Sequence, residues 1–388
     1  MSPITVRKVQ TRAEHRVFFE FPYHLYKDSP YWVPPLKSSR RKLLDQHKDP
    51  AWQYMEGDYF IAWRDQTPVG TIAAFVNHRH NQRWHENIAW FGAFDFVDDV
   101  DVAMALLQTA ESWAKERGYT ALRGPATFTL HSEVGVLMRP FDRPPLILMP
   151  YNYDYYPHHI EAAGYGKIKD LLTYCTDLQD VLGAENFAKR RDQSKRIAQR
   201  IMQREGITYR RGNPRNKKAD YEFIRQVYAE GWYDNWGFIE LTDQEFEHLV
   251  QELQLVYDPK MAFFVSVKGK PAAFVVGTPD LNQALHWARP SLREPEFLTL
   301  LKALWFWKVR RKVTTLRFAL AGISREFHGS GVIAVLAHAW FEVFADPNLS
   351  WKHYDGGWVL EDNEKMNLFL EKSLVNACRL YRIYQKTL

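Results

Sequence analysis

The chain has 388 residues, of which 46% are hydrophobic and 15% aromatic, so it is long and apolar enough for two domains with sizeable cores. No run of about eighteen apolar residues occurs, and residues 1–16 lack the apolar stretch of a signal peptide, so neither a membrane span nor secretion is indicated. The two cysteines, Cys175 and Cys378, are far apart in the sequence and lack metal-ligand spacing; we expect reduced packing residues in a cytoplasmic protein.

The first half of the chain reads as strands and helices in alternation. They are predicted as a strand at 4–7, a helical stretch to Tyr26, paired strands at 59–64 and 69–76, a strand at 88–96 and a long helix at 102–117. Asp95, Asp98 and Asp99 lie at the junction of the last strand and helix. Their negative charge should repel a phosphate group, so we expect no anion site there.

Three histidines lie between two of these strands. His78, His80 and His85 have a spacing that metal ligands can show, but the segment is polar and has no carboxylate at a useful spacing. We interpret it as a solvated loop and predict no metal site.

The positive charge of the chain is concentrated near its middle. Residues 187–218 hold twelve Lys or Arg residues against Asp192 and Glu205, a local charge of +10 in a chain whose net charge is +5. The first part, residues 185–204, is predicted to be a basic helix with Phe187, Ile197 and Ile201 on an apolar stripe. A solvated linker helix and a helix attracted to acidic lipid headgroups or to phosphates are the two interpretations. Stacking aromatics are not interleaved with the charges, which argues against nucleic acid.

The second half repeats the order of the first. Residues 207–210 match the pattern of residues 4–7 at a distance of 203 residues. The elements predicted after them are a helical stretch at 221–232, paired strands at 263–268 and 271–277, a strand at 314–320 and a helix at 332–344. A repeat of this length indicates two domains of the same fold.

The turn before the helix at 332–344 is rich in glycine, with Gly322, Gly329 and Gly331. A glycine-rich turn that opens a helix leaves backbone N–H groups free to point at a phosphate, with the positive end of the helix dipole behind them. The spacing fits neither a P-loop nor a dinucleotide-binding fingerprint. The turn is therefore a candidate phosphate cradle, and an ordinary strand-to-helix turn is the alternative.

Residues 326–331, Glu-Phe-His-Gly-Ser-Gly, resemble the pyrophosphate loop of the GCN5-related N-acetyltransferase (GNAT) superfamily, in which Gln or Arg takes the place of Glu326. The motifs at 122–125 and 145–156 and the ending from GGWVLEDNEKM to YRIYQKTL resemble a bacterial branch that includes the bacterial ceramide synthases. The resemblance spans nearly the whole chain. Position 370 is Leu, where many members carry a tyrosine that protonates the leaving thiolate; Tyr381 and Tyr384 are the nearby tyrosines.

The resemblance implies an α/β (α+β) fold of two tandem GNAT-like domains, each a mixed sheet flanked by helices. We place an N-terminal domain with a degenerate CoA site at 1–180, a basic linker helix at 181–206 and a CoA-binding C-terminal domain at 207–388. Acyl-CoA would be the donor substrate. The residues expected to bind CoA are Gly322, Ile323, His328, Gly329, Ser330, Gly331, Val332 and Asn363.

An N-acyltransferase needs a base that keeps the attacking amine neutral and a pocket for the acceptor. Asp280, which follows a hairpin strand, is one candidate base, with an Asx turn as the alternative. Glu361 is the other, with plain helix capping in its segment as the alternative. The aromatic stretch at 230–238 suits a long-chain acceptor or forms a small core. The residues expected to bind the acceptor are Trp232, Asn235, Trp236, Asn282 and His286.

The sequence thus predicts transfer of an acyl group from CoA to an amine by direct attack on the thioester, with a long-chain, sphingoid-like amine as the most specific version. Two alternatives stay open. One is an aminoacyl transferase like the peptidoglycan-bridge Fem proteins, which also pair two GNAT-like domains; the other is a non-catalytic protein that binds CoA or lipid. The expected partners are acyl-CoA, an amine acceptor and, through the basic helix, anionic membrane at the inner face.

Overall fold

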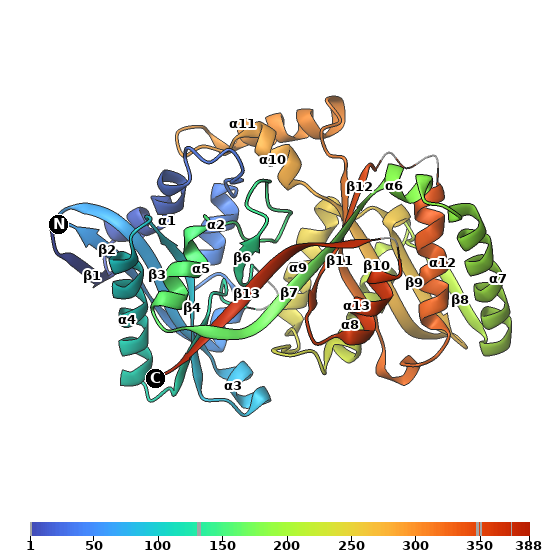
Figure 1. Ribbon diagram of the computed structural model, residues 1–388, viewed down its shortest axis with the longest axis horizontal. Helices are drawn as coiled ribbons and strands as arrows, with labels where there is room; N and C mark the ends of the chain where they lie inside the picture. The colour runs from blue at the N-terminus through green and yellow to red at the C-terminus, as the bar shows by residue number, and fades with distance from the viewer. Residues whose placement is uncertain (1, 130–132, 347–348, 350, 374) are drawn as a thin grey trace. The chain divides into compact units, whose positions relative to one another are not determined.

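The computed structural model describes residues 2–129, 133–346, 349, 351–373 and 375–388 (Figure 1). Its contacts divide the chain into two compact units. Unit 1 comprises Met1–Leu171, Leu281–Val313 and Arg379–Leu388, and unit 2 comprises Leu172–Asp280 and Thr314–Cys378.

Unit 1 holds the elements of the first half of the chain together with an insertion from the second half. Its strands are β1 (Ile4–Lys8), β2 (Met55–Arg64), β3 (Thr67–Asn77), β4 (Ile88–Phe96), β5 (Ala121–Gly124), β6 (Val136–Arg139), the first part of β7 (Gly166–Asp177) and the last part of β13 (Asn376–Thr387). Its helices are α1 (Arg12–Leu25), α2 (Lys37–Leu44), η1 (Pro50–Gln53), α3 (His78–Trp84), α4 (Val100–Glu116), α5 (Tyr155–Ala162), α10 (Asn282–Ala288), α11 (Glu296–Leu304) and η3 (Trp305–Val309).

The sheet of unit 1 is mixed. β1, β2, β3 and β4 pair antiparallel in that order, β4 pairs with β5 in parallel, and the end of β13 pairs antiparallel with β5. α4 packs on this sheet and buries one apolar face, which includes Val102, Leu106 and Leu107. The buried residues of α4 recur with the period of a helix that has one covered face, whereas β3 and β4 are buried almost continuously, as expected for strands covered on both faces.

Unit 2 repeats this order of elements. Its strands are β8 (Ile207–Arg211), β9 (Ala262–Val267), β10 (Lys270–Pro279), β11 (Thr315–Ile323) and β12 (His353–Leu360), with the remaining parts of β7 and β13. Its helices are α6 (Leu178–Gly183), α7 (Phe187–Glu205), α8 (Lys217–Trp232), α9 (Asp243–Val256), η2 (Pro259–Met261), η4 (Arg325–Phe327), α12 (Val332–Ala345) and α13 (Glu364–Glu371).

The pairing of unit 2 follows the same rule as that of unit 1. β8, β9, β10 and β11 pair antiparallel in that order, and β11 pairs with β12 in parallel. α12 follows β11 as α4 follows β4, and α7 lies alongside α12 (Figure 1). Three antiparallel pairings followed by one parallel pairing, twice in one chain, confirm the predicted fold class and the predicted repeat.

Three local predictions need correction. The segment with His78, His80 and His85 is not a loop: α3 includes His78 and His80, buries His80, and has His85 as its C-cap residue. The apolar stripe of α7 is shifted, because Ile197 is 42% exposed while Ala198 is fully buried and Ile201 packs against the core. The helices α10, α11 and η3 were not predicted at all.

Candidate functional site

The predicted strand, loop and helix of the phosphate cradle are present in unit 2. β11 ends at Ile323, the short turn η4 follows, and α12 begins at Val332. Gly329 has φ +84°, which glycine adopts without strain. Gly331 is the N-cap residue and has no side chain to bind the first amides of α12. These amides therefore depend on groups from elsewhere for their hydrogen bonds.

A carboxylate from another helix occupies the start of α12. Gly331 N donates to Glu205 Oε2 at 2.9 Å, and Glu205 is the last residue of α7. Hydrogen bonds from Arg204 and from the Gly331 amide lower the pKa of Glu205. α7 comes so close that a Cβ on Gly331 would lie 2.0 Å from Ile201 Cγ2. The helix start thus binds an anionic group, and that group belongs to the protein.

Two of the predicted CoA-binding side chains contact the loop itself. His328 Nε2 lies 3.1 Å from Ile323 O, and Ser330 Oγ donates to Phe327 O at 2.7 Å. Val332 N donates to Ser330 Oγ at 3.4 Å. These contacts fix the shape of the turn, so its amides are held in place before any ligand binds.

Two further residues of the cradle prediction have contacts of their own. Gly322 lies where a Cβ would be 3.1 Å from the ring of Phe274, which is tight packing within the sheet. Glu326, at the Gln or Arg position of the family loop, forms an exposed ion pair with Lys270 at 3.1 Å.

β11 and β12 part close to the cradle. The described parallel register between them ends at Phe318 and Gly356, although both strands continue. Trp232, the last residue of α8, lies at this divergence: its Nε1 donates to Ala321 O at 2.7 Å, and its ring lies 6.3 Å from that of Trp358. The predicted acceptor residue Trp232 is therefore beside the point where the two strands separate.

Four buried polar residues lie near the same divergence. In the strand register Arg317 is opposite Thr278 on one side and Asp355 on the other, so the three side chains point to one face of the sheet. Asp280 is two residues beyond Thr278, and its N donates to Thr315 O at 3.0 Å, which continues the ladder. All four are at most 4% exposed. Buried ionisable groups gathered in this way are typical of functional sites.

Arg317 and Asp355 were missed by the sequence analysis. Arg317 is a charged residue inside the predicted strand at 314–320, which on its own is read as a solvent-facing position, and no strand was predicted at Asp355. Arg317 Nη2 in fact donates to Gly357 O at 3.1 Å within the sheet. The available signal for Arg317 was the run at 316–321, Leu-Arg-Phe-Ala-Leu-Ala, in which every residue except Arg317 is apolar and which therefore offers no polar face to solvent.

The two candidate bases have different surroundings. Asp280 is 2% exposed, whereas Glu361 follows β12 and is partly buried. Asn363 caps α13, since its Oδ1 accepts from Met366 N at 3.2 Å. Helix capping, the alternative raised for this segment, is thus found at Asn363.

Two predicted acceptor residues fall in unit 1. Asn282 and His286 belong to α10, and Asn282 Nδ2 donates to Pro145 O at 3.1 Å. Burial, together with the charge of Arg289, lowers the pKa of His286. Asp280, although only two residues before Asn282, is assigned to unit 2.

The tyrosines near the end of the chain also fall in unit 1. Tyr381 and Tyr384 belong to the last part of β13, and Tyr384 Oη donates to Glu161 Oε1 at 2.8 Å. Tyr381 and Tyr384 are both fully buried.

The aromatic stretch at 230–238 has one part that forms a small core and another part that lies in a turn. Trp232 lies 6.2 Å from Phe238 and 5.0 Å from Tyr228 between ring centroids, and Phe238 is buried. These three form the small core that was the alternative. Asn235 and Trp236 are partly buried in the turn, where Asn235 N donates to Trp232 O at 2.9 Å.

The two cysteines are neighbours in space although they are far apart in the sequence. Cys175 and Cys378 are free thiols, and the contact with Cys175, followed by burial, raises the pKa of Cys378. Cys378 Sγ lies 3.8 Å from Asp355 Oδ2 and 3.4 Å from Thr173 Oγ1. The pair therefore extends the row of buried polar groups that begins at Asp280.

The three carboxylates at the start of α4 in unit 1 all have partners. Asp99 is the N-cap: its Oδ1 accepts from Asp101 N at 2.9 Å and its Oδ2 from Arg64 at 2.7 Å. Asp98 contacts His159 at 2.8 Å. Asp95 accepts from Tyr26 Oη at 3.1 Å, and burial raises the pKa of Asp95.

The histidine segment takes part in an ion-pair network of unit 1. His80 Nε2 lies 2.8 Å from Glu86 Oε2, and Arg123 contacts the same carboxylate at 2.7 Å. Burial raises the pKa of Glu86, but the hydrogen bonds from His80 and Arg123 outweigh it and lower that pKa to about 2. Across the part of the chain that the structure describes, no group of three or more His, Cys, Asp or Glu residues could hold a metal ion.

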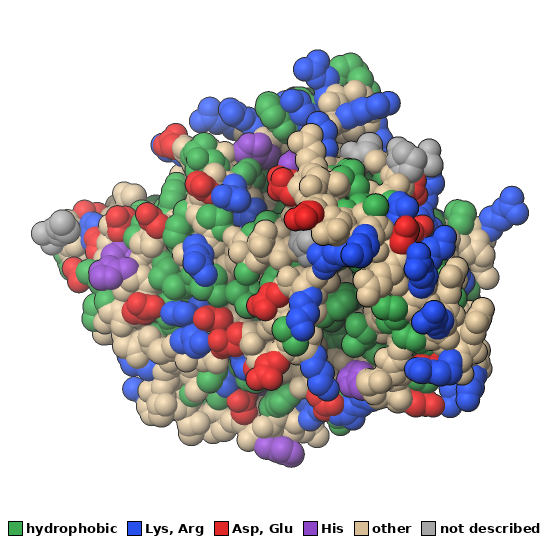
Figure 2. Space-filling model, turned by 45° about the vertical axis from the view of Figure 1, so that its right-hand side comes forward, with side chains coloured by type: hydrophobic (Ala, Val, Ile, Leu, Met, Phe, Trp, Pro, Cys, Tyr) green, Lys and Arg blue, Asp and Glu red, His purple; other side chains and the backbone are tan. Residues whose placement is uncertain are grey.

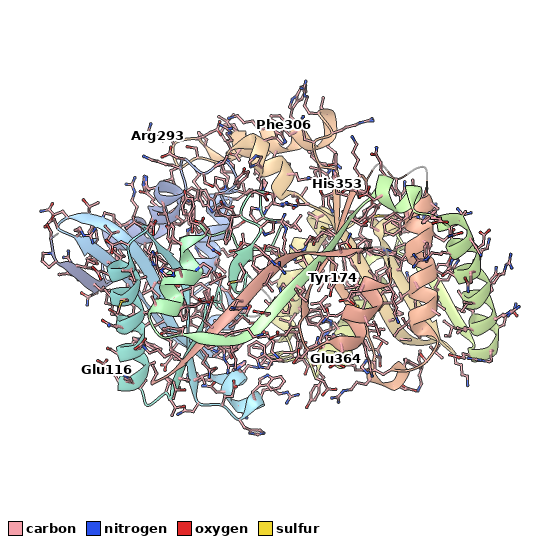
Figure 3. All side chains as sticks on the ribbon, viewed as in Figure 1. Glu116, Tyr174, Arg293, Phe306, His353 and Glu364 are labelled. Atoms are coloured by element: carbon pink, nitrogen blue, oxygen red, sulfur yellow. The ribbon has the colours of Figure 1, made fainter. Side chains whose placement is uncertain are left out.

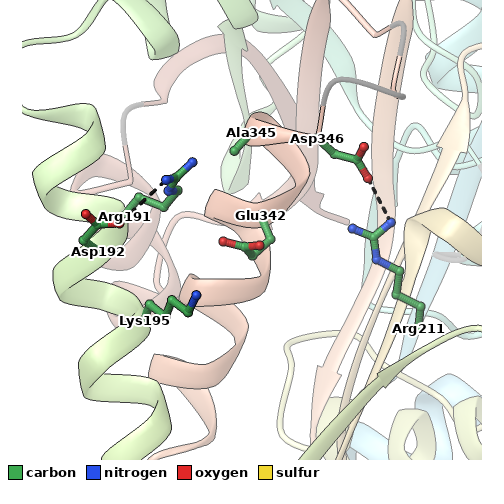
Figure 4. A pocket seen from close by; sticks show the side chains of 7 residues that line it. All are labelled: Arg191, Asp192, Lys195, Arg211, Glu342, Ala345 and Asp346. Carbon is green, nitrogen blue, oxygen red and sulfur yellow. Dashed lines mark hydrogen bonds and ion pairs between the residues drawn. The ribbon is translucent and has the colours of Figure 1, made fainter.

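A cavity of about 340 Å³ lies between α7 and the last turns of α12 (Figure 4). Its walls carry both signs of charge, and Arg211 contacts Asp346 at 3.3 Å across it. It is lined by Arg191, Asp192, Lys195, Arg211, Glu342, Ala345 and Asp346. Glu342 is ten residues beyond the start of α12, or about 15 Å along the helix. The cavity is thus at the negative end of the α12 dipole and is separate from the cradle.

Known proteins resemble this chain over nearly its full length. Protein YghO of Escherichia coli (strain K12) is 31% identical over 383 residues, which are 98% of this chain and 95% of that protein. Bacterial ceramide synthase of Caulobacter vibrioides (strain NA1000 / CB15N) is 29% identical over 391 residues, 99% of this chain and 98% of that protein. No protein-family model matches the chain.

Solved structures share the fold at low identity. A tandem GNAT protein from the clavulanic acid biosynthesis pathway aligns with a TM-score of 0.52 and 9% identity over 99% of this chain and 98% of that one. A GCN5-related glucosamine N-acetyltransferase region of a fungal multi-domain GH3 β-N-acetylglucosaminidase aligns with a TM-score of 0.53 and 13% identity over 100% of this chain and 38% of that one. Both agree with the doubled order of strands and helices described above.

Proposed function

We propose that this chain, which belongs to the tandem-domain branch of the GCN5-related N-acetyltransferase superfamily that holds YghO and bacterial ceramide synthase, is an N-acyltransferase with acyl-CoA as its donor. The observation that carries the proposal is the start of α12, where a glycine N-cap leaves its amide to an anion. A glycine turn that opens a helix in this way suits a diphosphate.

The CoA diphosphate would take the place of the Glu205 carboxylate at the amide of Gly331 and that of Ser330 Oγ at the amide of Val332. The other residues proposed to contact CoA are Gly322, Ile323, His328, Gly329, Ser330 and Asn363. Since Glu205 is anionic and already bound, its displacement costs part of the binding free energy. CoA affinity should therefore depend on Glu205, although Glu205 does not contact the thioester.

In the proposed reaction the amine nitrogen attacks the carbonyl carbon of the thioester, the C–S bond breaks, and the proton of the amine ends on the CoA thiol. Asp280 is proposed to accept that proton, directly or through water, with Glu361 as the second candidate. Arg317, on the same face of the sheet as Asp280, offsets the cost of burying negative charge there.

The acceptor is proposed to be a long-chain amine of the sphingoid type, which is the version that the name of the Caulobacter relative supports. Trp232, Asn235 and Trp236, together with Asn282 and His286, are the proposed acceptor-binding residues. An apolar acceptor agrees with the aromatic side chains beside the divergence of β11 and β12.

The functional domains are proposed to follow the sequence, with residues 1–180 lacking a CoA site, 181–206 as the linker and 207–388 binding CoA. We place the enzyme in the cytoplasm and at the inner face of the membrane, where a long-chain amine is dissolved in lipid.

Release of free thiol tests the function. The full-length chain is mixed with a long-chain acyl-CoA, with and without a sphingoid base, and thiol is followed with a colorimetric reagent while the product is identified by mass spectrometry. We expect thiol release that depends on the amine, in equal amount with the N-acyl product. A chain whose melting temperature rises with CoA but which releases no thiol would be a binding protein. Transfer from aminoacyl-tRNA instead of acyl-CoA would support the Fem-like alternative.

A further inference from the structure

The insertion of unit 1 that holds α11 and η3 turns apolar side chains toward solvent. Of the nine described residues of α11, Thr299 is the buried one, at 1% exposure. The usual amphipathic arrangement of a helix on a globular protein is therefore inverted. The exposed apolar residues, which we call the α11 surface, are Phe297, Leu298, Leu300, Leu301, Leu304, Trp305 and Val309. Phe297 and Leu301 are 62% and 59% exposed.

Positive charge lies directly beside the α11 surface. The eight residues from Trp305 to Lys312 include Lys308, Arg310, Arg311 and Lys312 and no acidic residue. Figure 2 shows hydrophobic and basic side chains together at the top of the molecule, the region that α11 occupies in Figure 1. Lys308 lies 3.5 Å above the ring of Trp307, and Lys312 lies 4.5 Å above that of Trp287. Cations and indole rings are thus interleaved here.

Polar groups of the insertion, residues 281–313, bind to α2 and to one another. Glu296 Oε2 accepts from Ser38 N at 2.9 Å, and Thr299 Oγ1 donates to Glu294 Oε2 at 3.2 Å. The ring of Trp287 packs 5.9 Å from that of Phe306, which Figure 3 labels near α11. Both carboxylates of the segment are therefore engaged within the protein, and the α11 surface carries apolar and cationic groups.

We propose that the α11 surface docks on an anionic lipid bilayer. Leucine and phenylalanine side chains enter the acyl-chain boundary, tryptophan is favoured at the level of the headgroups, and Lys and Arg beside them attract acidic lipids. Two copies of this surface placed face to face would bring like charges together, which disfavours a second copy as the partner. The proposal does not depend on the acyltransferase reaction, since docking needs no CoA.

α7 carries more positive charge but is a poorer docking surface. The large apolar residue that it exposes is Ile197, at 42%. Some of its cations are engaged, as Arg190 Nη2 donates to Lys372 O at 2.7 Å and Arg204 pairs with Glu205 at 2.6 Å. α7 can therefore add long-range attraction, but the structure offers it no apolar face to insert.

Sedimentation with vesicles tests the apolar part of the proposal. Full-length protein is mixed with phosphatidylcholine vesicles that do or do not contain phosphatidylglycerol, and the bound fraction is measured. Leu301→Ser/Leu304→Ser should weaken binding about tenfold or more, because apolar side chains no longer enter the bilayer. The matched control is Leu182→Ser/Leu368→Ser, which removes two leucines of similar exposure, 48% and 51%, from other helices and should leave binding unchanged.

The charged part is tested with the same vesicles. Changing Lys308, Arg310, Arg311 and Lys312 to Gln should weaken binding to the acidic vesicles about a thousandfold, since each of the four cations near the surface contributes roughly 1 kcal/mol. Binding should also fall with added salt. The comparison variant changes Lys189, Arg190, Arg191, Lys195 and Arg196 of α7 to Gln and should have a smaller effect.

Three results would overturn the proposal. One is unchanged vesicle binding by Leu301→Ser/Leu304→Ser while circular dichroism shows the wild-type fold. Another is loss of binding in the α7 variant but not in the α11 variants. The third is a wild-type dimer in analytical ultracentrifugation that Leu301→Ser/Leu304→Ser converts to a monomer, with no vesicle binding by either, which would assign the surface to a second copy.

Discussion

The helices α4 and α12 occupy equivalent places in the two repeats, and both begin at a bound carboxylate. At α4 the carboxylate is that of the cap residue itself, Asp99, which also pairs with Arg64. At α12 the cap is Gly331 and the carboxylate is Glu205, brought from α7, 126 residues away in the sequence. The first cap is local and cannot leave the helix without unwinding its turn, whereas the second is held by tertiary packing and can be replaced.

We propose that this difference lets one fold serve two purposes. A helix start with its own Asp is satisfied and stable, so it gains nothing from an external anion. A helix start with Gly presents its amides to whatever anion comes close; here the chain supplies Glu205, and in the proposed function a diphosphate replaces it. The first repeat is thus built for stability and the second for exchange. The two should respond in opposite ways to substitution.

The largest effect is expected at Asp280 in the second repeat. General-base help contributes about a hundredfold to ten-thousandfold in rate, so Asp280→Asn should lower turnover by about that factor while CoA binding stays intact. A higher pH supplies more neutral amine and should restore part of the loss. Turnover is measured by thiol release.

The matched control in the first repeat is Asp98→Asn, which removes a carboxylate with an exposed side chain and should leave turnover unchanged. If Asp280→Asn keeps nearly full activity while Glu361→Gln loses it, the base is the residue after β12, and the Asp ends a strand without acting on the amine.

A stability effect is expected in the first repeat at Glu86. Its pKa is about 2 in the folded chain against 4.5 in model compounds, so its contribution is complete above about pH 4.5 and is lost as the pH falls toward 2. This pKa difference sets an upper bound of ~3 kcal/mol on the contribution of Glu86 to the free energy of unfolding. Because 28% of the side chain is exposed, we expect a contribution of about 2 kcal/mol.

Urea unfolding of Glu86→Gln at neutral and at acidic pH checks this expectation. The variant should be less stable than the wild type at pH 7, and the difference should shrink as the pH falls below 4. A difference that is the same at both pH values would mean that the carboxylate charge does not matter there.

A smaller effect is expected at Glu205. Replacing Glu205 by Gln removes the negative charge that competes with a diphosphate, so CoA should bind about tenfold more tightly. Asp99→Asn in the first repeat should leave CoA affinity unchanged and reduce stability by about 1 kcal/mol, because the ion pair with Arg64 is lost. Isothermal titration with CoA measures both. Equal CoA affinity in Glu205→Gln and wild type would show that the Gly331 amide is not the diphosphate site.

Gly331 itself is less suitable for such a test. A Cβ there would overlap Ile201 at 2.0 Å, so Gly331→Val would disturb the packing of α7 on α12 whether or not CoA binds. Gly329, with open space around its Cβ position but φ +84°, would add backbone strain instead. Glu205→Gln, by contrast, changes the charge at the start of α12 and leaves the backbone conformation unchanged.

The strands and the repeat were predictable because they depend on local periodicity. β4 runs from Ile88 to Phe96 as expected, and α12 starts at Val332 as expected. Burial on one face and turn residues at the corners carry this information within a window of a few residues. The same holds for the glycine turn, whose conformational demand at Gly329 is visible in the sequence.

The rest depends on contacts between distant segments. Nothing near Gly331 in the sequence indicates that Glu205 will cap it, and nothing near Arg317 indicates that Asp355 will lie opposite on β12. α11 was missed for another reason. The sequence carries the signal of a helix, since Phe297, Leu300, Leu301 and Leu304 have the i, i+3, i+4, i+7 spacing of an apolar helix face, but no helix was predicted from it. What the sequence does not show is that this apolar face points to solvent.

Hydrogen exchange in the presence of CoA tests whether CoA binds at the start of α12 and not at the start of α4, since it observes both helix starts in one experiment. We expect CoA to slow exchange of the amides at residues 329–333, at the start of α12, and to leave those at residues 99–103, at the start of α4, unchanged. Protection at the start of α4, or no change at the start of α12 under conditions where CoA is bound, would contradict the assignment of the CoA site to the second repeat.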